Sequence, residues 1–526
     1  MKRRAFLQNM TSLVVVPGLL NSISVNASNT LPMLAALANA DNTDRVLVLV
    51  QLRGGNDGLN TVIPLNQITA YTNARTNIAI KQSDVLTLNG YSQTGLHPAM
   101  TGLQQKFNEG KVKIIQSVGY PSTNFSHFRA TDIWFSASDS NQIVSTGWAG
   151  RFLDSQYPNF PVGYPNTTMP DPLAIEIGSI LSLGFQGPSM NMSISVSDPT
   201  NFYNMINGVQ DPVPNTPAGK ELAYIRTTAL QTNQYSLRIK DAANSIVQQS
   251  PAYPVAKANS LADQLKIVAR LIAGGLKTKV YMVNLGGFDT HNLQVDTTNT
   301  SIGTHATLLG KVSEAINAFM EDLKFLNISD RVIGMTFSEF GRRIKSNLSN
   351  GTDHGTSAPM FIFGDRIVGG VLGSNPTIPA SPTVNDNVPM QYDFRSVYAS
   401  ILEQWFGLNK TLLETVMLKN FQSLALINNS GTDVKEIQTD KINTLISNYP
   451  NPFSASTTIK FETQGEHTSV EIMDTSGKRL LILTDKEYEA GTYQLNFDAS
   501  ALSPGVYYAR LQNKHIQQVT AMLKNQ

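Results

Sequence analysis

The chain has 526 residues, of which 41% are hydrophobic, so it is long enough for more than one domain and for a large buried core. Its 40 basic and 39 acidic residues nearly cancel, which excludes the strongly basic surface typical of a partner of nucleic acid or of anionic membranes. The chain contains no cysteine. Disulfides, thiolate metal sites, a catalytic cysteine and a lipid-anchored N-terminal cysteine are therefore excluded.

The N-terminal segment, residues 1–27, has the form of an export signal. Arg3 and Arg4 precede a short apolar stretch at 13–20, and small residues near Ala27 offer a cleavage site. The apolar stretch is too short to span a bilayer, and we expect no transmembrane segment in the mature chain. The arginine pair resembles a twin-arginine signal, and an ordinary secretory signal with two chance arginines is the alternative. Both interpretations predict that the mature chain leaves the cytoplasm.

Four apolar runs of strand length follow in the main part of the chain, at residues 46–52, 111–118, 279–285 and 331–337. Continuous apolar runs of this length are typical of strands buried on both faces. Helical periodicity at 261–276 and 306–326 separates the later runs. The alternation predicts an α/β fold with a central, mostly parallel sheet flanked by helices. In such sheets, ligands bind just beyond the carboxyl ends of the strands.

Polar residues stand at the end of each of these runs. In chain order they are Asp57, then Ser126 and His127, then Asp289 and His291, then Glu339 and Arg342. A further glycine-bordered turn holds Asp353 and His354. An aspartate close to a neutral imidazole can bind one divalent cation, and zinc is the favoured ion. The alternative is an aspartate that caps its turn beside a surface histidine. Because the clusters follow separate strands, we interpret them as one candidate site.

The last part of the chain, residues 447–526, is predicted to be a separate unit that follows a linker at 426–446. Short alternating runs lie at 457–461, 469–473 and 505–511. Separated by turns, they predict a small all-β sandwich. The unit resembles the C-terminal sorting domain of the type IX secretion route, through the strings NYPNPF at 448–453, DTSGKRL at 474–480 and LSPGVYYARL at 502–511. The resemblance implies secretion machinery as a partner, and a cell-surface or extracellular location reached through the periplasm.

Residues 43–425 resemble a family of exported bacterial proteins that belongs to the alkaline phosphatase and sulfatase-like superfamily. The resemblance is carried by LRGGNDGLNTVIP (52–64), LHPAM (96–100), NFSHFRATDIW (124–134), GGFDTH (286–291), SEFGRR (338–343), GTDHG (351–355) and DFRSVYASILEQWFG (393–407). It implies an alkaline-phosphatase-like α/β domain that binds one or two divalent ions. The implied ligands are Asp57, Asp289, His291, Asp353 and His354. The implied nucleophile is Ser126 at a helix start, with Ser122 and Thr123 less favoured.

Two departures from the superfamily pattern limit what the resemblance implies. No histidine follows His354 until His467, which lies in the sorting domain. A second metal site is therefore incomplete, uses His127 or Glu339, or is absent. The formylglycine type of sulfatase is disfavoured, because the string Ser126–Arg129 lacks the proline of its motif and the chain has no cysteine.

The residues and the resemblance together give the hypothesis of a metal-dependent hydrolase of phosphate or sulfate esters. Ser126, with His127 beside it, attacks a small-molecule or glycan ester, or a metal-activated water does so directly. Arg129 or Arg342 steadies the oxygens of the transferred group. The alternative is a non-catalytic surface protein that binds glycans on the same scaffold. The missing late histidine favours that alternative, and the Asp–His clusters oppose it.

Overall fold

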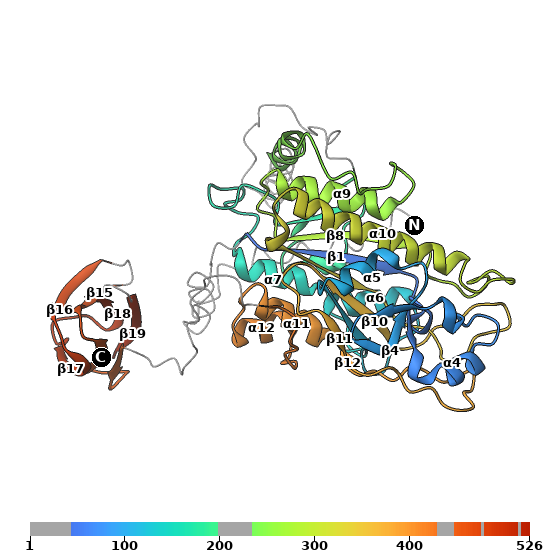
Figure 1. Ribbon diagram of the computed structural model, residues 1–526. Helices are drawn as coiled ribbons and strands as arrows, with labels where there is room; N and C mark the ends of the chain where they lie inside the picture. Colours follow the sequence, from blue (N-terminus) through green and yellow to red (C-terminus); the bar gives the residue numbers. More distant parts are fainter. Residues whose placement is uncertain (1–43, 198–233, 429–445, 475–477, 514–516, 526) are drawn as a thin grey trace, which may run out of the picture. The chain divides into compact units, whose positions relative to one another are not determined.

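The computed structural model describes residues 44–197, 234–428, 446–474, 478–513 and 517–525 (Figure 1). The expected export signal and nearly all of the expected linker lie outside these residues. The chain divides into two compact units, residues 1–429 and 430–526. The domain boundaries expected from the sequence stay predictions.

A nine-stranded sheet forms the centre of the first unit. The strand order is β11–β5–β10–β9–β1–β8–β6–β7, and β12 pairs with β5. The strands are β1 (Val46–Arg53), β5 (Val112–Gly119), β6 (Ala174–Ile177), β7 (Ser193–Val196), β8 (Val280–Gly286), β9 (Val332–Phe337), β10 (Ala358–Phe363), β11 (Gly370–Leu372) and β12 (Tyr392–Asp393). Only β10 is antiparallel to its neighbours, β5 and β9; the other pairs are parallel. The expected mostly parallel α/β class is confirmed.

Helices cover both faces of this sheet, and the two faces have separate hydrophobic cores. One core includes residues of α5 (Thr101–Asn108), α9 (Ser260–Ala273) and α10 (Thr304–Phe325). The other includes residues of α6 (His127–Ser136), α7 (Trp148–Gln156), α11 (Phe394–Gln404) and α12 (Lys410–Met417). Figure 1 shows α9 and α10 on one side of β1 and β8, with α7, α11 and α12 on the other.

Strand β1 explains why the sequence shows a continuous apolar run. Val48 and Val50 pack into the core of α9 and α10, whereas Leu47 and Leu49 pack into the core of α6 and α7. Successive side chains of a strand point to opposite faces, so a strand covered on both faces needs apolar residues at every position.

Shorter elements border the central sheet. A three-stranded antiparallel sheet contains β2 (Val62–Pro64), β3 (Leu86–Leu88) and β4 (Tyr91–Leu96). The short helices are α3 (Gly58–Thr61) and α4 (Ile68–Ala74), and the 3₁₀ turns are η3 (Leu65–Gln67), η4 (Gln82–Asp84), η5 (Leu183–Phe185) and η6 (Ser329–Arg331). Within the described parts of the chain, no helix is long and apolar enough to cross a membrane.

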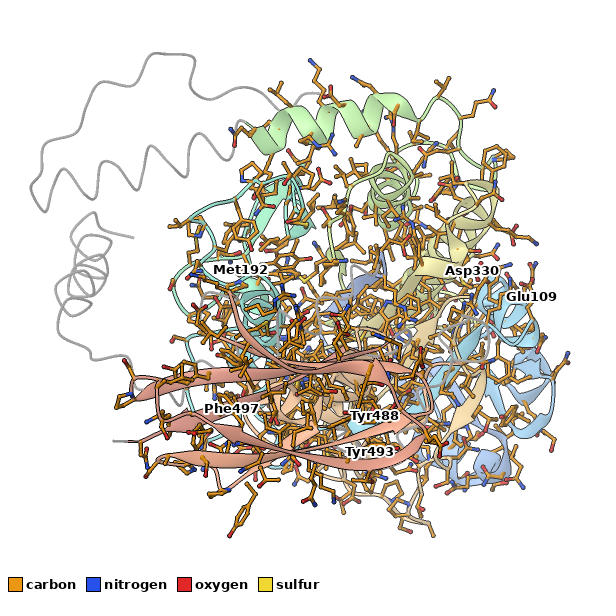
Figure 2. The ribbon with its side chains drawn as sticks, turned by 90° about the vertical axis from the view of Figure 1, so that its left-hand side faces the viewer. Glu109, Met192, Asp330, Tyr488, Tyr493 and Phe497 are labelled. Atoms are coloured by element: carbon orange, nitrogen blue, oxygen red, sulfur yellow. The ribbon has the colours of Figure 1, made fainter. Side chains whose placement is uncertain are left out.

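The second unit consists of two antiparallel sheets that share one apolar core. One sheet contains β13 (Ile446–Tyr449), β14 (Ser456–Gln464) and β17 (Ala490–Asp498), and the other contains β16 (Arg479–Glu487), β15 (His467–Met473), β18 (Gly505–Asn513) and β19 (Gln517–Lys524). Figure 2 labels Phe497 and the tyrosines Tyr488 and Tyr493 on this unit; the two tyrosine rings lie 4.5 Å apart. The predicted all-β architecture is confirmed.

Candidate metal centre

The sheet brings five separate segments of the chain to one edge. The carboxyl ends of β1 and β8 lie side by side, with Arg53 paired to Gly286, and β9 ends beside them. Strand β10 is antiparallel to β9 and to β5, so β5 also ends at this edge and β10 begins there, with Ala358 paired to Val118. The loops that carry the predicted site residues therefore meet at the carboxyl edge of the sheet.

Three side chains from three of these loops form a group that could hold a metal ion: His127, Asp289 and His354. One ligand atom from each lies within 4.8 Å of the other two. Nε2 of His127 is 3.5 Å from Oδ2 of Asp289, and Nε2 of His354 is 3.3 Å from Oδ1. The Asp289 side chain is 47% exposed, so the group is open to solvent. Two imidazole nitrogens and a carboxylate are donors that suit zinc.

Both histidines are oriented by an acceptor on their other ring nitrogen. Nδ1 of His354 is 2.9 Å from the carbonyl oxygen of Phe125, which can only accept, so Nδ1 carries the proton. Nδ1 of His127 is 2.9 Å from Oε1 of the buried Glu339. A proton held on Nδ1 leaves the Nε2 lone pair free for a metal, and metal-binding histidines commonly have such a partner.

The charges around the group favour an ionised carboxylate and a neutral imidazole. Burial acts to raise the pKa of Asp289, but the Arg342 guanidinium at 2.7 Å, together with His291, lowers that pKa to about 2. Burial and the positive charge of Arg342 lower the pKa of His354 below its ordinary value. A neutral imidazole beside an ionised carboxylate is the protonation state that a divalent cation requires.

Arg342 joins the loops of the site. Its side chain is fully buried and donates from Nε to the Gly55 carbonyl at 2.7 Å and from Nη1 to the Thr352 carbonyl at 2.7 Å. Its Nη2 donates to Asp289 and to the carbonyls of Phe288 and Gly54. Because all three nitrogens donate within the protein, the geometry makes Arg342 a residue that positions Asp289. This geometry does not favour the expected contact between Arg342 and the substrate.

Two other expected site residues lie beside the group. Nδ1 of His291 is 2.8 Å from Oδ1 of Asp289, and its ring centroid is 4.6 Å from that of His354. Ser126 is the exposed N-cap of α6, directly before His127, and its hydroxyl makes no capping hydrogen bond. Ser126 thus stands directly before the first residue of α6, His127.

Arg129, expected to contact the transferred group, instead donates hydrogen bonds to backbone carbonyls. Its Nη2 donates to the carbonyls of Asp139 at 3.4 Å, Ser140 at 3.3 Å and Gln142. These bonds tie the guanidinium to the loop that follows α6.

The structure does not bring Asp57 into the three-residue group. Asp57 is fully buried and forms an ion pair with Nη1 of Arg75 at 2.6 Å, while Nε2 of Gln294 donates to the same oxygen at 2.6 Å. Burial acts to raise the pKa of Asp57, but the positive charge of Arg75 and these hydrogen bonds lower it. Arg75, which no sequence motif indicated, therefore supplies the positive charge that the resemblance assigned to a metal ion.

Asp353 also lies outside the group, although its neighbour His354 belongs to it. The Asp353 carboxylate is exposed and accepts from Nδ2 of Asn347 at 3.1 Å. Adjacent residues in an extended segment point in opposite directions, so only one member of the Asp–His pair faces Asp289.

Several solved structures resemble this chain. They include a protein in the alkaline phosphatase superfamily from Vibrio parahaemolyticus (9% identity, 91% of this chain and 84% of that chain covered, TM-score 0.34). A putative sulfatase from Bacteroides thetaiotaomicron VPI-5482 (8%, 91% and 85%, TM-score 0.31) and the alkaline phosphatase from the Antarctic bacterium TAB5 (9%, 72% and 99%, TM-score 0.26) also match. No curated protein matches the chain.

Two families match the sequence over nearly all of its length beyond the N-terminal segment. Residues 447–525 match the secretion system C-terminal sorting domain, which implies export to the cell surface or beyond, with the secretion machinery as partner. Residues 44–417 match the family described as "Protein of unknown function (DUF1501)". The chain therefore belongs to the DUF1501 family and carries a type IX sorting domain at its C-terminus.

Proposed function

We propose that the protein is an exported, metal-dependent hydrolase of phosphate or sulfate esters, with one divalent ion held by His127, Asp289 and His354. The observation that carries the proposal is the orientation of the two imidazoles. Each has its Nδ1 held by an acceptor, and each directs Nε2 to the same carboxylate, at 3.5 and 3.3 Å. Three protein ligands leave a coordination position open, which is typical of catalytic rather than structural zinc sites.

The donor set fits such an ion on grounds other than spacing. A purely structural ion-pair network would not need an acceptor behind each imidazole or an exposed carboxylate between them. Here Glu339 and the Phe125 carbonyl fix the two rings, and Arg342 fixes the carboxylate from the protein side. The remaining side of Asp289 is open to solvent, where a substrate has access.

The surrounding residues suit ester hydrolysis. A bound divalent ion lowers the pKa of a nucleophile and neutralises charge on the transferred group. The Ser126 hydroxyl is exposed beside His127, which supports its role as nucleophile. It stands at the N-terminus of α6, where free backbone N–H groups attract an anion. His291, whose Nδ1 lies 2.8 Å from Oδ1 of Asp289, helps to hold that carboxylate beside the three ligands.

The proposal includes the export route. The sorting domain addresses the chain to the surface, and the N-terminal segment is expected to carry it into the periplasm first, as a twin-arginine signal. The substrate would then be a small-molecule or glycan ester outside the cell.

One observation favours the alternative of a non-catalytic, glycan-binding surface protein. Asp57, an expected metal ligand, has its charge balanced by Arg75 inside the protein. A site that has lost one ligand can retain the scaffold while losing the reaction.

Metal content and ester hydrolysis of the purified full chain test the proposal. We expect bound zinc or another divalent ion, and hydrolysis of p-nitrophenyl phosphate or p-nitrophenyl sulfate that a chelator abolishes. His354→Ala should lose both the metal and the activity. His467→Ala is the matched control, because it removes an exposed histidine from the second unit. A wild-type chain that binds no metal and hydrolyses neither ester would support the glycan-binding alternative.

A further inference from the structure

An ester of phosphate or sulfate carries negative charge, and a site that binds it commonly supplies a guanidinium. Three arginines near the metal centre already donate to the protein backbone. Arg129 and Arg342 do so as described above. Arg343 donates from Nε to the His354 carbonyl at 2.9 Å and from Nη1 to the Asn385 carbonyl. A guanidinium at this edge that makes no such bonds is a better candidate for binding the anion.

Arg53 is the last residue of β1 and is exposed at the carboxyl edge. Its backbone carbonyl accepts from the amide of Phe288. Its guanidinium, in contrast, makes no hydrogen bond or ion pair to any residue in the described ranges. An exposed guanidinium at a central strand end, without such a bond, can receive an anion from solution.

The strand geometry places Arg53 on the face of the sheet that carries α6. Leu47 and Leu49 pack into the core that includes Trp134 of α6, and residues two apart on a strand share a face. Arg53 continues that series. On the neighbouring strand it is in register with Gly286, where an added Cβ atom would meet nothing within 4 Å. The space beside Arg53 on this face is therefore open.

A short chain of contacts joins this position to the metal centre. The amide of Gly54, the residue after Arg53, donates to Oε1 of Glu339 at 2.8 Å. The same oxygen is 2.9 Å from Nδ1 of His127. One glutamate thus lies between the backbone that follows Arg53 and a proposed metal ligand.

We propose that Arg53 binds the anionic phosphate or sulfate group of the substrate beside the metal centre. This inference rests on the proposed function and deepens it, because it names the residue that selects an anionic ester. A guanidinium offers two parallel N–H donors to a tetrahedral oxyanion, which a single ammonium cannot match. Arg53 contacts the substrate and does not take part in binding the metal, which is held by its three ligands.

Binding of inorganic phosphate and inorganic sulfate to the metal-loaded full chain tests this, measured by calorimetry alongside metal content. In Arg53→Ala we expect the metal content to be unchanged and the affinity for the preferred anion to fall by about tenfold or more. Arg53→Lys should retain part of the affinity, because it keeps the charge but not the paired donors. Lys345→Ala is the matched control, because it removes another exposed cation without touching the site; its affinity should equal that of the wild type.

The outcomes separate this inference from the proposed function. Equal anion affinity in wild type and Arg53→Ala would overturn the role of Arg53, while wild-type metal content and hydrolysis would still support the hydrolase. Loss of metal together with the anion would also overturn it, since Arg53 would then be structural. Failure of the wild type to bind either anion would have the same consequence. Anion binding that depends on Arg53 in a chain without hydrolysis would support this inference and oppose the hydrolase.

Discussion

Asp57 and Asp289 follow neighbouring parallel strands, β1 and β8, and both stand in glycine-rich turns at the same edge of the sheet. Each is paired with a buried arginine, and each has a lowered pKa. Their exposure differs completely: the Asp57 side chain is fully buried and that of Asp289 is 47% exposed. A similar local sequence has therefore produced a closed ion pair in one turn and an open carboxylate in the other.

The difference comes from what the other elements bring to each carboxylate. Asp57 is closed off from solvent, and Arg75 and Gln294 both bond to its Oδ2. Oδ1 of Asp289 is contacted by Arg342, His291 and His354, Oδ2 faces His127, and the side chain stays partly open to solvent. Two ionisable residues with the same sequence signal can thus have a structural and a chemical role, according to whether the opposing charge is supplied by the protein alone.

The largest effect is expected at the closed pair. Arg75→Ala leaves a buried carboxylate without its cation, and we expect the free energy of unfolding of the first unit to fall by about 3–5 kcal/mol. Urea unfolding followed by tryptophan fluorescence measures this, because all three tryptophans lie in that unit. The double variant Asp57→Asn/Arg75→Met removes both charges and should recover part of the loss. An Arg75→Ala chain with the wild-type midpoint would contradict a charged, closed pair.

Near Asp289, Glu339 holds the ring of His127 and should affect metal affinity more than folding stability. Glu339→Gln removes the charge that holds Nδ1 of His127, and we expect metal affinity to fall by about 10–100-fold. Competition with a chromogenic chelator measures the affinity. Glu414→Gln makes the same change of charge at an exposed glutamate of α12, outside the group, and serves as the matched control. Unchanged metal affinity in Glu339→Gln would show that the orientation of His127 does not depend on Glu339.

Much of the first unit could be predicted from the sequence, because a strand buried on both faces appears as a continuous run of apolar residues. The apolar runs became β1, β5, β8 and β9, and the helical patterns became α9 and α10. The reversed direction of β10 was not predicted, because the direction of pairing is set by contacts with β5 and β9 and not by its own residues. Strands β6 and β7, with four residues each, are too short to give a periodic signal.

The candidate site was predictable to the extent that its residues follow strands. His127, Asp289 and His354 were named from the sequence and lie together in the structure. Arg75 was missed because it follows α4 without any recognisable motif. It lies 18 residues after Asp57, but the carbonyls of Ile344 and Arg343 that also hold its guanidinium are 269 and 268 residues away in the chain. The burial of Arg342 and the direction of Asp353 depend on how several loops pack, which no short sequence pattern contains.

The stability of the wild type and of the uncharged variant Asp289→Asn should depend differently on pH in the acid range. The folded pKa of Asp289, about 2, lies below the ordinary value of 3.8. A depressed carboxyl pKa contributes stability above the unfolded pKa and loses it as pH falls through the folded pKa. In the metal-free chain, we expect the free energy of unfolding of the wild type to exceed that of Asp289→Asn by about 1 kcal/mol near neutral pH. This value is reduced because the Asp289 side chain is exposed to solvent. The difference should shrink between about pH 4 and pH 2 in unfolding measurements; a constant difference would contradict the ionised contact with Arg342.

The smallest effect is expected at Asp353, and it is the sharpest test of which carboxylate serves the metal. Its side chain is exposed and accepts a hydrogen bond from Nδ2 of Asn347 at 3.1 Å. Removing an exposed side chain away from the ligands should change metal affinity by no more than about twofold, because such substitutions commonly alter free energies by less than about 0.5 kcal/mol. Asp353→Ala should therefore keep its metal in the chelator competition, whereas Asp289→Ala should lose it. If Asp353→Ala lost the metal and Asp289→Ala kept it, the adjacent pair Asp353 and His354 would hold the metal, and Asp289 would be, like Asp57, a structural partner of a buried arginine.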